Sequence, residues 1–266
     1  MKLSIVTVNF NNLEGLRKTY ESIVCQTFTD YEWLVIDGGS TDGSREFIEQ
    51  HQNKFAYWCS EKDKGIYNAM NKGLIRTKGE YINFMNSGDC FVSKETLAAV
   101  FCKERKADIL YGYEMIGSIN GTFYPPLSMQ DKVRWYALYR DSLPHQASFI
   151  RRCLFNTIGL YDENCKIVAD WKWFAKAFLS HEASYEFIPR KIAIMQKGGI
   201  SDTVACLSER KRQREEIFPH YITEEDALNL TILSIIQSKI ITCFLFKILK
   251  VISIYFNSIH RRYIIV

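Results

Sequence analysis

The stretch Leu34-Val-Ile-Asp-Gly-Gly-Ser-Thr-Asp-Gly43 decides the fold of this chain. Its apolar, partly β-branched start predicts a buried strand, and the acidic and small residues that follow predict a strand end and a tight turn. Two more stretches have this form, Ser4-Ile-Val-Thr-Val-Asn-Phe10 and Tyr81-Ile-Asn-Phe-Met-Asn-Ser-Gly-Asp89. Ligands of open α/β sheets bind outside the carboxyl ends of the strands. The polar residues that close these three stretches are therefore expected to share one crevice.

Segments with strand and helix patterns alternate through the first hundred residues. The predicted strands are 2–8, 31–37, 55–60 and 81–85, and the predicted helices are 13–26, 45–53, 67–78 and 94–106. This alternation predicts a doubly wound parallel sheet with right-handed crossovers. After Asp108 the pattern changes, with predicted strands at 109–116, 121–124, 185–189 and 192–196, an apolar run at 143–150 and an aromatic-rich helix at 170–181. This part is predicted to be a mixed sheet.

Composition indicates a globular protein without a nucleic-acid partner. The hydrophobic content of 47% suffices for a core, and a net charge of +4 over 266 residues is too mild to indicate nucleic-acid binding. None of the eight cysteines forms a Cys-x-x-Cys pair, so a zinc ribbon is not expected. Met1 and Lys2 lead straight into a strand pattern rather than a signal peptide, and we expect a cytoplasmic location.

The last forty residues differ from the rest of the chain. Residues 227–266 contain five Lys or Arg and no Asp or Glu. On a helix over 239–262, the basic and polar side chains fall mainly on one side and the apolar ones on the other. Such a helix is typical of a membrane surface, whereas Lys247 and Lys250 would lie inside a spanning segment. The alternative is a helix packed on the catalytic domain or on a partner subunit. We expect a catalytic domain at 1–220 and a basic amphipathic tail at 221–266.

Together these segments resemble family 2 glycosyltransferases with the GT-A fold. The resemblance is strong over residues 1–100 and weaker to about 200, and its matching stretches are 7–9, 26–28, 35–43, 63–73, 79–81 and 86–89. It implies a mainly parallel α/β sheet flanked by helices. It also implies transfer of a sugar from a nucleotide-diphosphate donor, with uridine as the default base and guanosine as the alternative.

The candidate nucleotide-binding residues are Thr7, Asn9, Asp37, Gly65, Asn71 and Ser87. Asp37 closes its strand and can accept a hydrogen bond from a base imide or a ribose hydroxyl. The alternative for Asp37 is a structural role in the Asp-Gly-Gly-Ser turn. Lys72 is a candidate diphosphate contact, with an ordinary surface lysine as the alternative.

Asp89 is the candidate metal ligand. The family motif is Asp-x-Asp, but this chain has Ser87-Gly88-Asp89. One carboxylate, diphosphate oxygens and waters can still hold Mg²⁺ or Mn²⁺, because Mg²⁺ keeps several waters and uses few protein ligands. The alternative is an aspartate that supports the turn at Gly88.

Asp170 is the candidate catalytic base. It precedes an aromatic helix, where the family places this acid, and burial against Trp171 and Trp173 would raise its pKa toward a useful value. The alternative is a plain helix N-cap. His145 is a second candidate, either for contact with the acceptor or the diphosphate, or as a core histidine.

The sequence therefore predicts an inverting glycosyltransferase whose acceptor is a saccharide, plausibly lipid-linked, at the inner membrane face. It leaves the sugar, the linkage and the oligomeric state open. A sugar nucleotidyltransferase is one alternative, but it would usually carry a glycine-rich basic loop after the first strand, where this chain has Asn9-Phe-Asn-Asn-Leu13. The other alternative is a non-catalytic sugar-nucleotide-binding module, which would retain ligand binding without Asp170.

Overall fold

A computed structural model describes residues 1–121, 138, 142–179, 181, 183–199 and 204–217. Contacts divide the chain into two units, Met1–Ile217 and Phe218–Val266. The predicted tail and most of the predicted strand at 121–124 lie outside the described residues. In the described part, no helix has the length and apolar character needed to cross a bilayer.

Eight strands and a set of short helices make up the first unit. The strands are β1 Leu3–Asn9, β2 Tyr31–Asp37, β3 Tyr57–Ser60, β4 Tyr81–Phe84, β5 Cys90–Phe91, β6 Ile109–Ile116, β7 Ser148–Arg151 and β8 Tyr185–Met195. The α-helices are α1 Leu13–Val24, α2 Ser44–Gln50, α3 Ile66–Leu74, α4 Thr96–Val100, α6 Cys153–Ile158, α7 Ala169–Leu179 and α8 Val204–Ile217. Two short 3-10 helices are η1 Gln52–Lys54 and η2 His145–Ala147.

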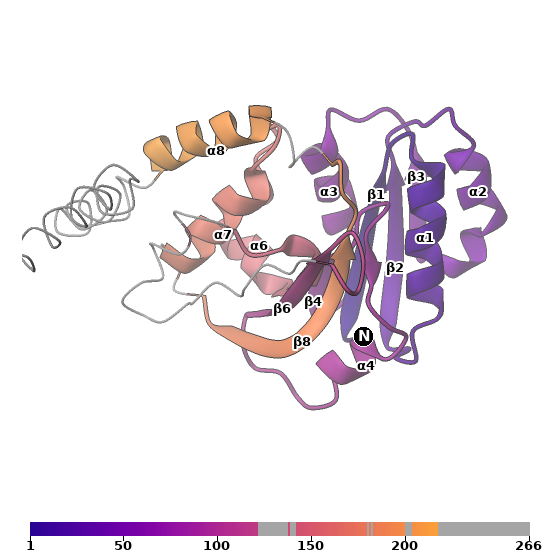
Figure 1. Cartoon of the computed structure of the whole chain (residues 1–266), viewed down its shortest axis with the longest axis horizontal. Helices are drawn as coiled ribbons and strands as arrows, with labels where there is room; N and C mark the ends of the chain where they lie inside the picture. The colour runs from indigo at the N-terminus through magenta and orange to yellow at the C-terminus, as the bar shows by residue number, and fades with distance from the viewer. Residues whose placement is uncertain (122–137, 139–141, 180, 182, 200–203, 218–266) are drawn as a thin grey trace, which may run out of the picture. The chain divides into compact units, whose positions relative to one another are not determined.

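The strands form one sheet in the order β3-β2-β1-β4-β7-β6-β8-β5. The first four are parallel, with β1 between β2 and β4, whereas β7 runs antiparallel to both of its neighbours, β4 and β6. Helix α3 covers one face of the parallel half, and α1 and α2 cover the other (Figure 1). The predicted doubly wound sheet with a mixed second half is confirmed.

Coverage on both faces explains the apolar runs that open the sequence. All seven residues of β1 are buried, as expected for a parallel strand packed by helices on both sides. Helix α3 approaches β1 closely at Gly73, where an added Cβ would lie 2.5 Å from a methyl of Val6. Only glycine allows this spacing without a shift of the helix.

The structure differs from the predicted elements at one helix and at two strands. The helix predicted over 94–106 is limited to α4, and the two strands predicted at 185–189 and 192–196 form the single strand β8. The pairing of β8 with β6 shifts between Phe187 and Lys191. Pro189 lies in this irregularity, where its missing N–H does not break a regular ladder.

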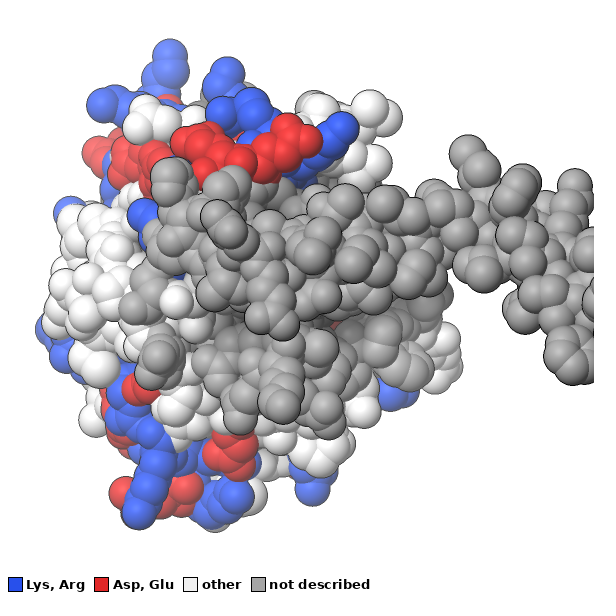
Figure 2. Space-filling view, turned by 90° about the vertical axis from the view of Figure 1, so that its left-hand side faces the viewer, with Lys and Arg blue, Asp and Glu red and all other residues white. Residues whose placement is uncertain are grey.

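Helix α8 carries charges of both signs. Arg212 pairs with Glu209 at 2.7 Å and with Glu216 at 3.3 Å. In Figure 2, acidic and basic side chains are intermixed at the top of the view. Helix α8 lies at the same height in Figure 1. This mixed surface contrasts with the basic composition of residues 227–266.

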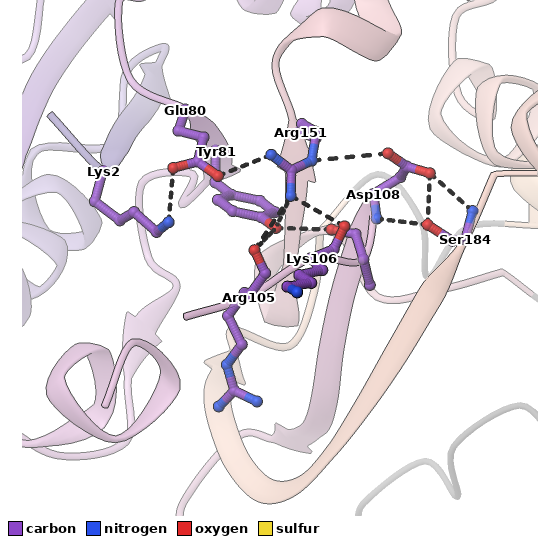
Figure 3. A network of polar contacts seen from close by, with 9 residues as sticks. Lys2, Glu80, Tyr81, Arg105, Lys106, Asp108, Arg151 and Ser184 are labelled. Atoms are coloured by element: carbon purple, nitrogen blue, oxygen red, sulfur yellow. Dashed lines mark hydrogen bonds and ion pairs between the residues drawn. The ribbon is translucent and has the colours of Figure 1, made fainter. Parts of the chain in front are cut away.

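Arg151 joins the ends of four strands (Figure 3). These ends lie at the side of the sheet opposite the strand ends that carry the predicted site residues. Its guanidinium donates to Glu80 at 2.8 Å and to the Tyr81 hydroxyl at 2.7 Å, and its Nε lies 3.7 Å from Asp108. Asp108 in turn accepts a 2.6 Å hydrogen bond from the Ser184 hydroxyl, next to β8. One cation thus holds together the ends of β4, β6, β7 and β8.

We expect Arg151→Met to lower the free energy of unfolding by about 2 kcal/mol, because it leaves partly buried acceptors without their charged donor. Urea unfolding measures this loss. Arg190→Met, at an exposed position of β8, is the matched control and should change stability by less than about 0.5 kcal/mol. Equal losses in the two variants would show that the network adds nothing.

Candidate active site

A cavity of about 890 Å³ lies at the carboxyl ends of the parallel strands. Five predicted site residues that line it are Asn9, Gly65, Ser87, Asp89 and Asp170, together with the second-ranked candidate His145. They come from the ends of β1 and β4, the start of α3, η2 and the start of α7. The expected convergence of strand-end polar residues therefore occurs.

Asp37 organises the turn beside this cavity. Its carboxylate is fully buried and accepts hydrogen bonds from Asn9, from Ser60 at 2.6 Å, and from both the amide and hydroxyl of Ser40. Burial alone would raise the pKa of Asp37, but these hydrogen bonds hold it below its usual value. Its oxygens are thus used by the protein, and the backbone of Gly38 and Gly39 lines the cavity instead.

Asn9 and Ser87 each present a polar atom without a partner. The Asn9 amide nitrogen donates to Asp37 at 2.7 Å and to Ser40 at 3.2 Å, which fixes the orientation of the amide. Its Oδ1 and the Ser87 hydroxyl are buried, and neither has a hydrogen-bond partner within the described residues. Because both residues line the cavity, these two atoms leave unused hydrogen-bonding capacity at its wall.

The loop after β4 is held in place by α1. The buried Thr19 hydroxyl accepts from the Gly88 amide at 3.0 Å and donates to the Asp89 carbonyl at 2.7 Å. Asn12 caps α1 through Gly15 and donates to the Ser87 carbonyl at 3.1 Å. Gly88 has a φ of 102°, which glycine adopts at no steric cost. Sequence reasoning missed Thr19, because nothing in a helical threonine signals a distant loop.

Asp89 is a buried carboxylate at the cavity wall, with 6% of its surface exposed. Its Oδ1 accepts from the Gln196 amide at 2.9 Å, and its Oδ2 accepts from the Gln146 side chain at 3.1 Å. Burial is the largest influence and raises the pKa of Asp89.

The residues fit a divalent cation held by one carboxylate. Each oxygen of Asp89 has a further lone pair, and Mg²⁺ completes its shell with phosphate oxygens and waters. Within the described ranges, no group of three His, Cys, Asp or Glu side chains surrounds a metal position. Any metal at this point would therefore depend on the ligand for much of its coordination.

Asp170 forms a compact group with His145 and Tyr67. Asp170 Oδ2 lies 3.2 Å from His145 Nδ1, and Oδ1 lies 2.9 Å from the Tyr67 hydroxyl, which also donates to the Ile167 carbonyl at 2.6 Å. Burial favours a higher pKa for Asp170, but the hydrogen bond and charge of His145 outweigh it and lower the pKa.

The predicted rise in the pKa of Asp170 from Trp171 and Trp173 is therefore wrong. The indole of Trp171 donates to the Leu138 carbonyl at 2.7 Å, and that of Trp173 donates to the Gly159 carbonyl at 2.8 Å. The neighbouring His145, 25 residues earlier in the sequence, and the Tyr67 hydroxyl hydrogen-bond the carboxylate and favour its ionised form instead. Their effect depends on tertiary folding, which sequence adjacency does not show.

Besides Asp37, three predicted contacts lie outside the cavity wall. The Thr7 hydroxyl is buried and accepts from the Trp33 indole at 2.9 Å. The Asn71 side chain accepts from the Tyr161 backbone amide at 3.0 Å and donates to the Tyr161 carbonyl at 2.9 Å. Lys72 pairs with Glu61 at 2.8 Å. Asn71 and Lys72 are thus both engaged by other residues of the protein around α3.

Sequence reasoning also missed three lysines. Lys62, Lys166 and Lys197 line the cavity from three different loops. The described residues include no ion-pair partner for any of them. A lysine in a loop carries little sequence signal, although the Lys197-Gly-Gly199 stretch shortly after β8 marks a strand end.

Comparison with known proteins is consistent with this geometry. The model for glycosyl transferase family 2 matches residues 4–162. An uncharacterized glycosyltransferase of Mycobacterium tuberculosis is 34% identical over 186 residues, covering 66% of this chain and 69% of the relative. A PGL/p-HBAD biosynthesis glycosyltransferase of Mycobacterium bovis is 30% identical over 220 residues, covering 79% and 82%.

Two solved structures share the fold. S. aureus TarS in complex with UDP-GlcNAc has a TM-score of 0.60 at 23% identity, covering 75% of this chain and 59% of the TarS chain. The mannosyltransferase of Pyrobaculum calidifontis, in complex with GDP-Man and Mn²⁺, has a TM-score of 0.56 at 15% identity, covering 80% and 61%. They confirm the predicted GT-A-like fold.

We expect Thr19→Val to destabilise the protein by about 1–3 kcal/mol, because the buried Gly88 amide loses its acceptor while side-chain volume is kept. Urea unfolding measures this change. Thr29→Val, at an exposed position after α1, is the control and should be near neutral. A Thr19 variant as stable as the control would show that the loop needs no anchor on α1.

Proposed function

Because the chain belongs to glycosyl transferase family 2, we propose that it moves a sugar from a nucleotide-diphosphate donor to an acceptor hydroxyl, with inversion at the anomeric carbon. The observation that carries this proposal is the single cavity lined by Asp89, Asp170 and the unpaired polar atoms of Asn9 and Ser87. The cavity thus offers a carboxylate for a cation, a carboxylate for a proton and positions for a polar ligand.

The nucleoside would bind near the ends of β1 and β2. The unpaired Asn9 Oδ1 can accept a hydrogen bond from a base imide or a ribose hydroxyl. Phe10, which is 64% exposed and lines the cavity, offers an aromatic face for a base. Asp37 would act indirectly, by fixing the turn at Gly38 and Gly39. The complexes of the structural neighbours support UDP or GDP as the carrier.

The diphosphate would bind beside Asp89. A divalent metal, Mg²⁺ or Mn²⁺, held there would neutralise the charge that develops on the leaving group. Gly65, at the start of α3, lines the same cavity, and the N-terminus of a helix favours anionic groups. Lys62 and Lys197 add positive charge: Lys62 lies next to Gly39, and Lys197 follows Gln196, which holds Asp89.

Asp170 would act as the base. The acceptor hydroxyl gives its proton to the Asp170 carboxylate as its oxygen forms a bond to the anomeric carbon. The bond between that carbon and the diphosphate breaks, and its electrons leave with the nucleoside diphosphate. A single displacement of this kind inverts the configuration and needs no covalent sugar–enzyme intermediate.

The acceptor is proposed to be lipid-linked, at the cytoplasmic face of a membrane. A cholesterol galactosyltransferase of Borreliella burgdorferi is 35% identical over 109 residues, covering 40% of this chain and 30% of the relative. The basic, acid-free composition of residues 227–266 supports attachment to an anionic surface. We therefore propose a role in cell-surface glycan assembly.

We expect one class of nucleotide-sugar to raise the thermal stability of the protein in a Mn²⁺-dependent manner. A panel of UDP-, GDP-, dTDP- and CDP-sugars tests this, and donor at 100 times its Kd should add about 2.7 kcal/mol. Asp89→Asn should remove the metal-dependent part of the shift. Asp170→Asn should keep the shift but abolish transfer.

The same panel separates the alternatives. A stabilising donor without turnover in the wild-type chain would support a binding module. If the nucleotide-sugar raises thermal stability equally without metal and in Asp89→Asn, the proposed role of Asp89 is contradicted. No shift with any nucleotide-sugar would contradict the donor assignment.

We expect the full-length chain to sediment with vesicles that contain anionic lipid, and deletion of residues 228–266 to abolish this, because the deletion removes five basic residues and the apolar face. A full-length variant with Lys247→Glu and Lys250→Glu should lose most binding while keeping chain length. Unchanged partition in both variants would contradict membrane attachment by the tail.

A further inference from the structure

Four side chains form a continuous polar row across the cavity wall. Asn86 Nδ2 lies 3.1 Å from His145 Nε2, His145 Nδ1 lies 3.2 Å from Asp170 Oδ2, and the row ends at the Tyr67 hydroxyl. The side chains of His145 and Asp170 are 17% and 19% exposed, so water screens their interaction weakly. His145 thus connects the proposed base to the loop that carries Asp89.

The two ring nitrogens of His145 can be satisfied in either charge state. In the neutral ring, Nδ1–H donates to Asp170 and the bare Nε2 accepts from the Asn86 amide nitrogen. In the imidazolium, a half-turn of the Asn86 amide brings its oxygen, which has no partner within the described residues, to Nε2–H. His145 can therefore gain or lose a proton without moving its ring.

Negative groups from three elements face His145. They are Asp170 on α7, Asp89 in the loop after β4, and Glu114 on β6. Tyr67 on α3 and the buried Tyr161 stand beside Asp170 as neutral hydroxyls, and Lys166 and Lys197 line the same cavity. Burial alone lowers the pKa of His145, but the hydrogen bond and charge of Asp170, with the other two acids, raise it above 6.5.

We propose that His145 is a positioning residue whose charge sets the strength of Asp170 as the catalytic base, an inference that rests on the proposed glycosyl transfer. An imidazolium 3.2 Å from the carboxylate stabilises its ionised form and so opposes protonation by the acceptor. Loss of the proton from His145 removes this opposing charge while the Nδ1–H hydrogen bond keeps Asp170 in place. Transfer therefore becomes faster as pH rises through the titration of His145.

The ionic coupling is tested first without turnover, by NMR titration of the histidine rings in the full-length chain. His145→Gln identifies the His145 signal by its loss. In Asp170→Asn the titration of His145 should move to lower pH by about one unit or more. Burial still disfavours the imidazolium in this variant, while the negative charge of Asp170 that stabilises it is lost. An unchanged titration in Asp170→Asn would overturn the proposal.

The effect on the base is tested by the pH dependence of donor turnover, with water as the acceptor and the nucleotide-sugar selected by the stabilisation panel. The acid limb of the wild-type profile should lie above pH 6.5, and His145→Gln should move it down by about one pH unit or more, with donor KM changed less than twofold. His51→Gln, remote on α2, is the matched control and should leave the limb in place. A limb that His145→Gln does not move would overturn the proposal.

Together the two experiments distinguish a failure of the proposed glycosyl transfer from a failure of the proposed role of His145. If wild-type protein turns over no nucleotide-sugar, the proposed transfer fails, and the proposal for His145, which rests on it, fails with it even if the coupling is seen by NMR. If the wild type turns over donor and His145→Gln lowers kcat equally at every pH, His145 serves only to hold the site together, and the proposal is overturned while the transfer stands.

Discussion

The parallel pairing of β1 with both β2 and β4 is the constraint on which the rest of the structure depends. The register places Asn9 opposite Asp37, and the Ser87 amide donates to the Val8 carbonyl at the next strand end. A slip of one residue would turn every side chain of β1 to the other face of the sheet. Asn9 would then leave Asp37, and the turn at Gly38 would lose its organising contact. The hydrogen bonds of Asn9 to Asp37 and of the Ser87 amide to the Val8 carbonyl are specific to this register.

Some buried polar groups near the cavity are hydrogen-bonded within the protein, whereas others have no hydrogen-bond partner among the described residues. Asp37 and Thr19 are completely buried, and their oxygens are matched by donors and acceptors of the protein itself. Asn9 Oδ1 and the Ser87 hydroxyl are buried without a partner in the described part of the chain. The first pair makes the two turns rigid, and the second keeps hydrogen-bonding capacity for a ligand. Rigidity and binding are thus assigned to neighbouring residues at the same strand ends.

The sequence predicts this fold well wherever local pattern and tertiary environment agree. The β2 strand was predicted with its observed bounds, and Asn9, Ser87 and Asp89 were predicted at the cavity because strand ends meet at one edge. The contact between His145 and Asp170 was not predictable, because it joins a 3-10 helix to α7 through side chains alone. Asn71 shows the opposite case: it lies in a segment that matches the family, yet its amide is used to hold the Tyr161 turn. A matching segment locates a site, but only the tertiary structure assigns each side chain.

The charges along the cavity wall account for a single acidic residue at the proposed metal position. Lys62, Lys166 and Lys197 balance Asp63, Asp89 and Asp170 in number, so the wall carries little net charge when His145 is neutral. A nucleotide-diphosphate sugar brings about two negative charges into this wall, and a divalent cation that enters with it offsets them. A second carboxylate beside Asp89 would add negative charge where the diphosphate binds, and the lysines would then have to offset it. With Ser87 in that place, one carboxylate and the diphosphate itself suffice as anionic ligands. The departure from Asp-x-Asp is thus consistent with the proposed metal-assisted transfer, in which the cation would depend on the donor for its binding.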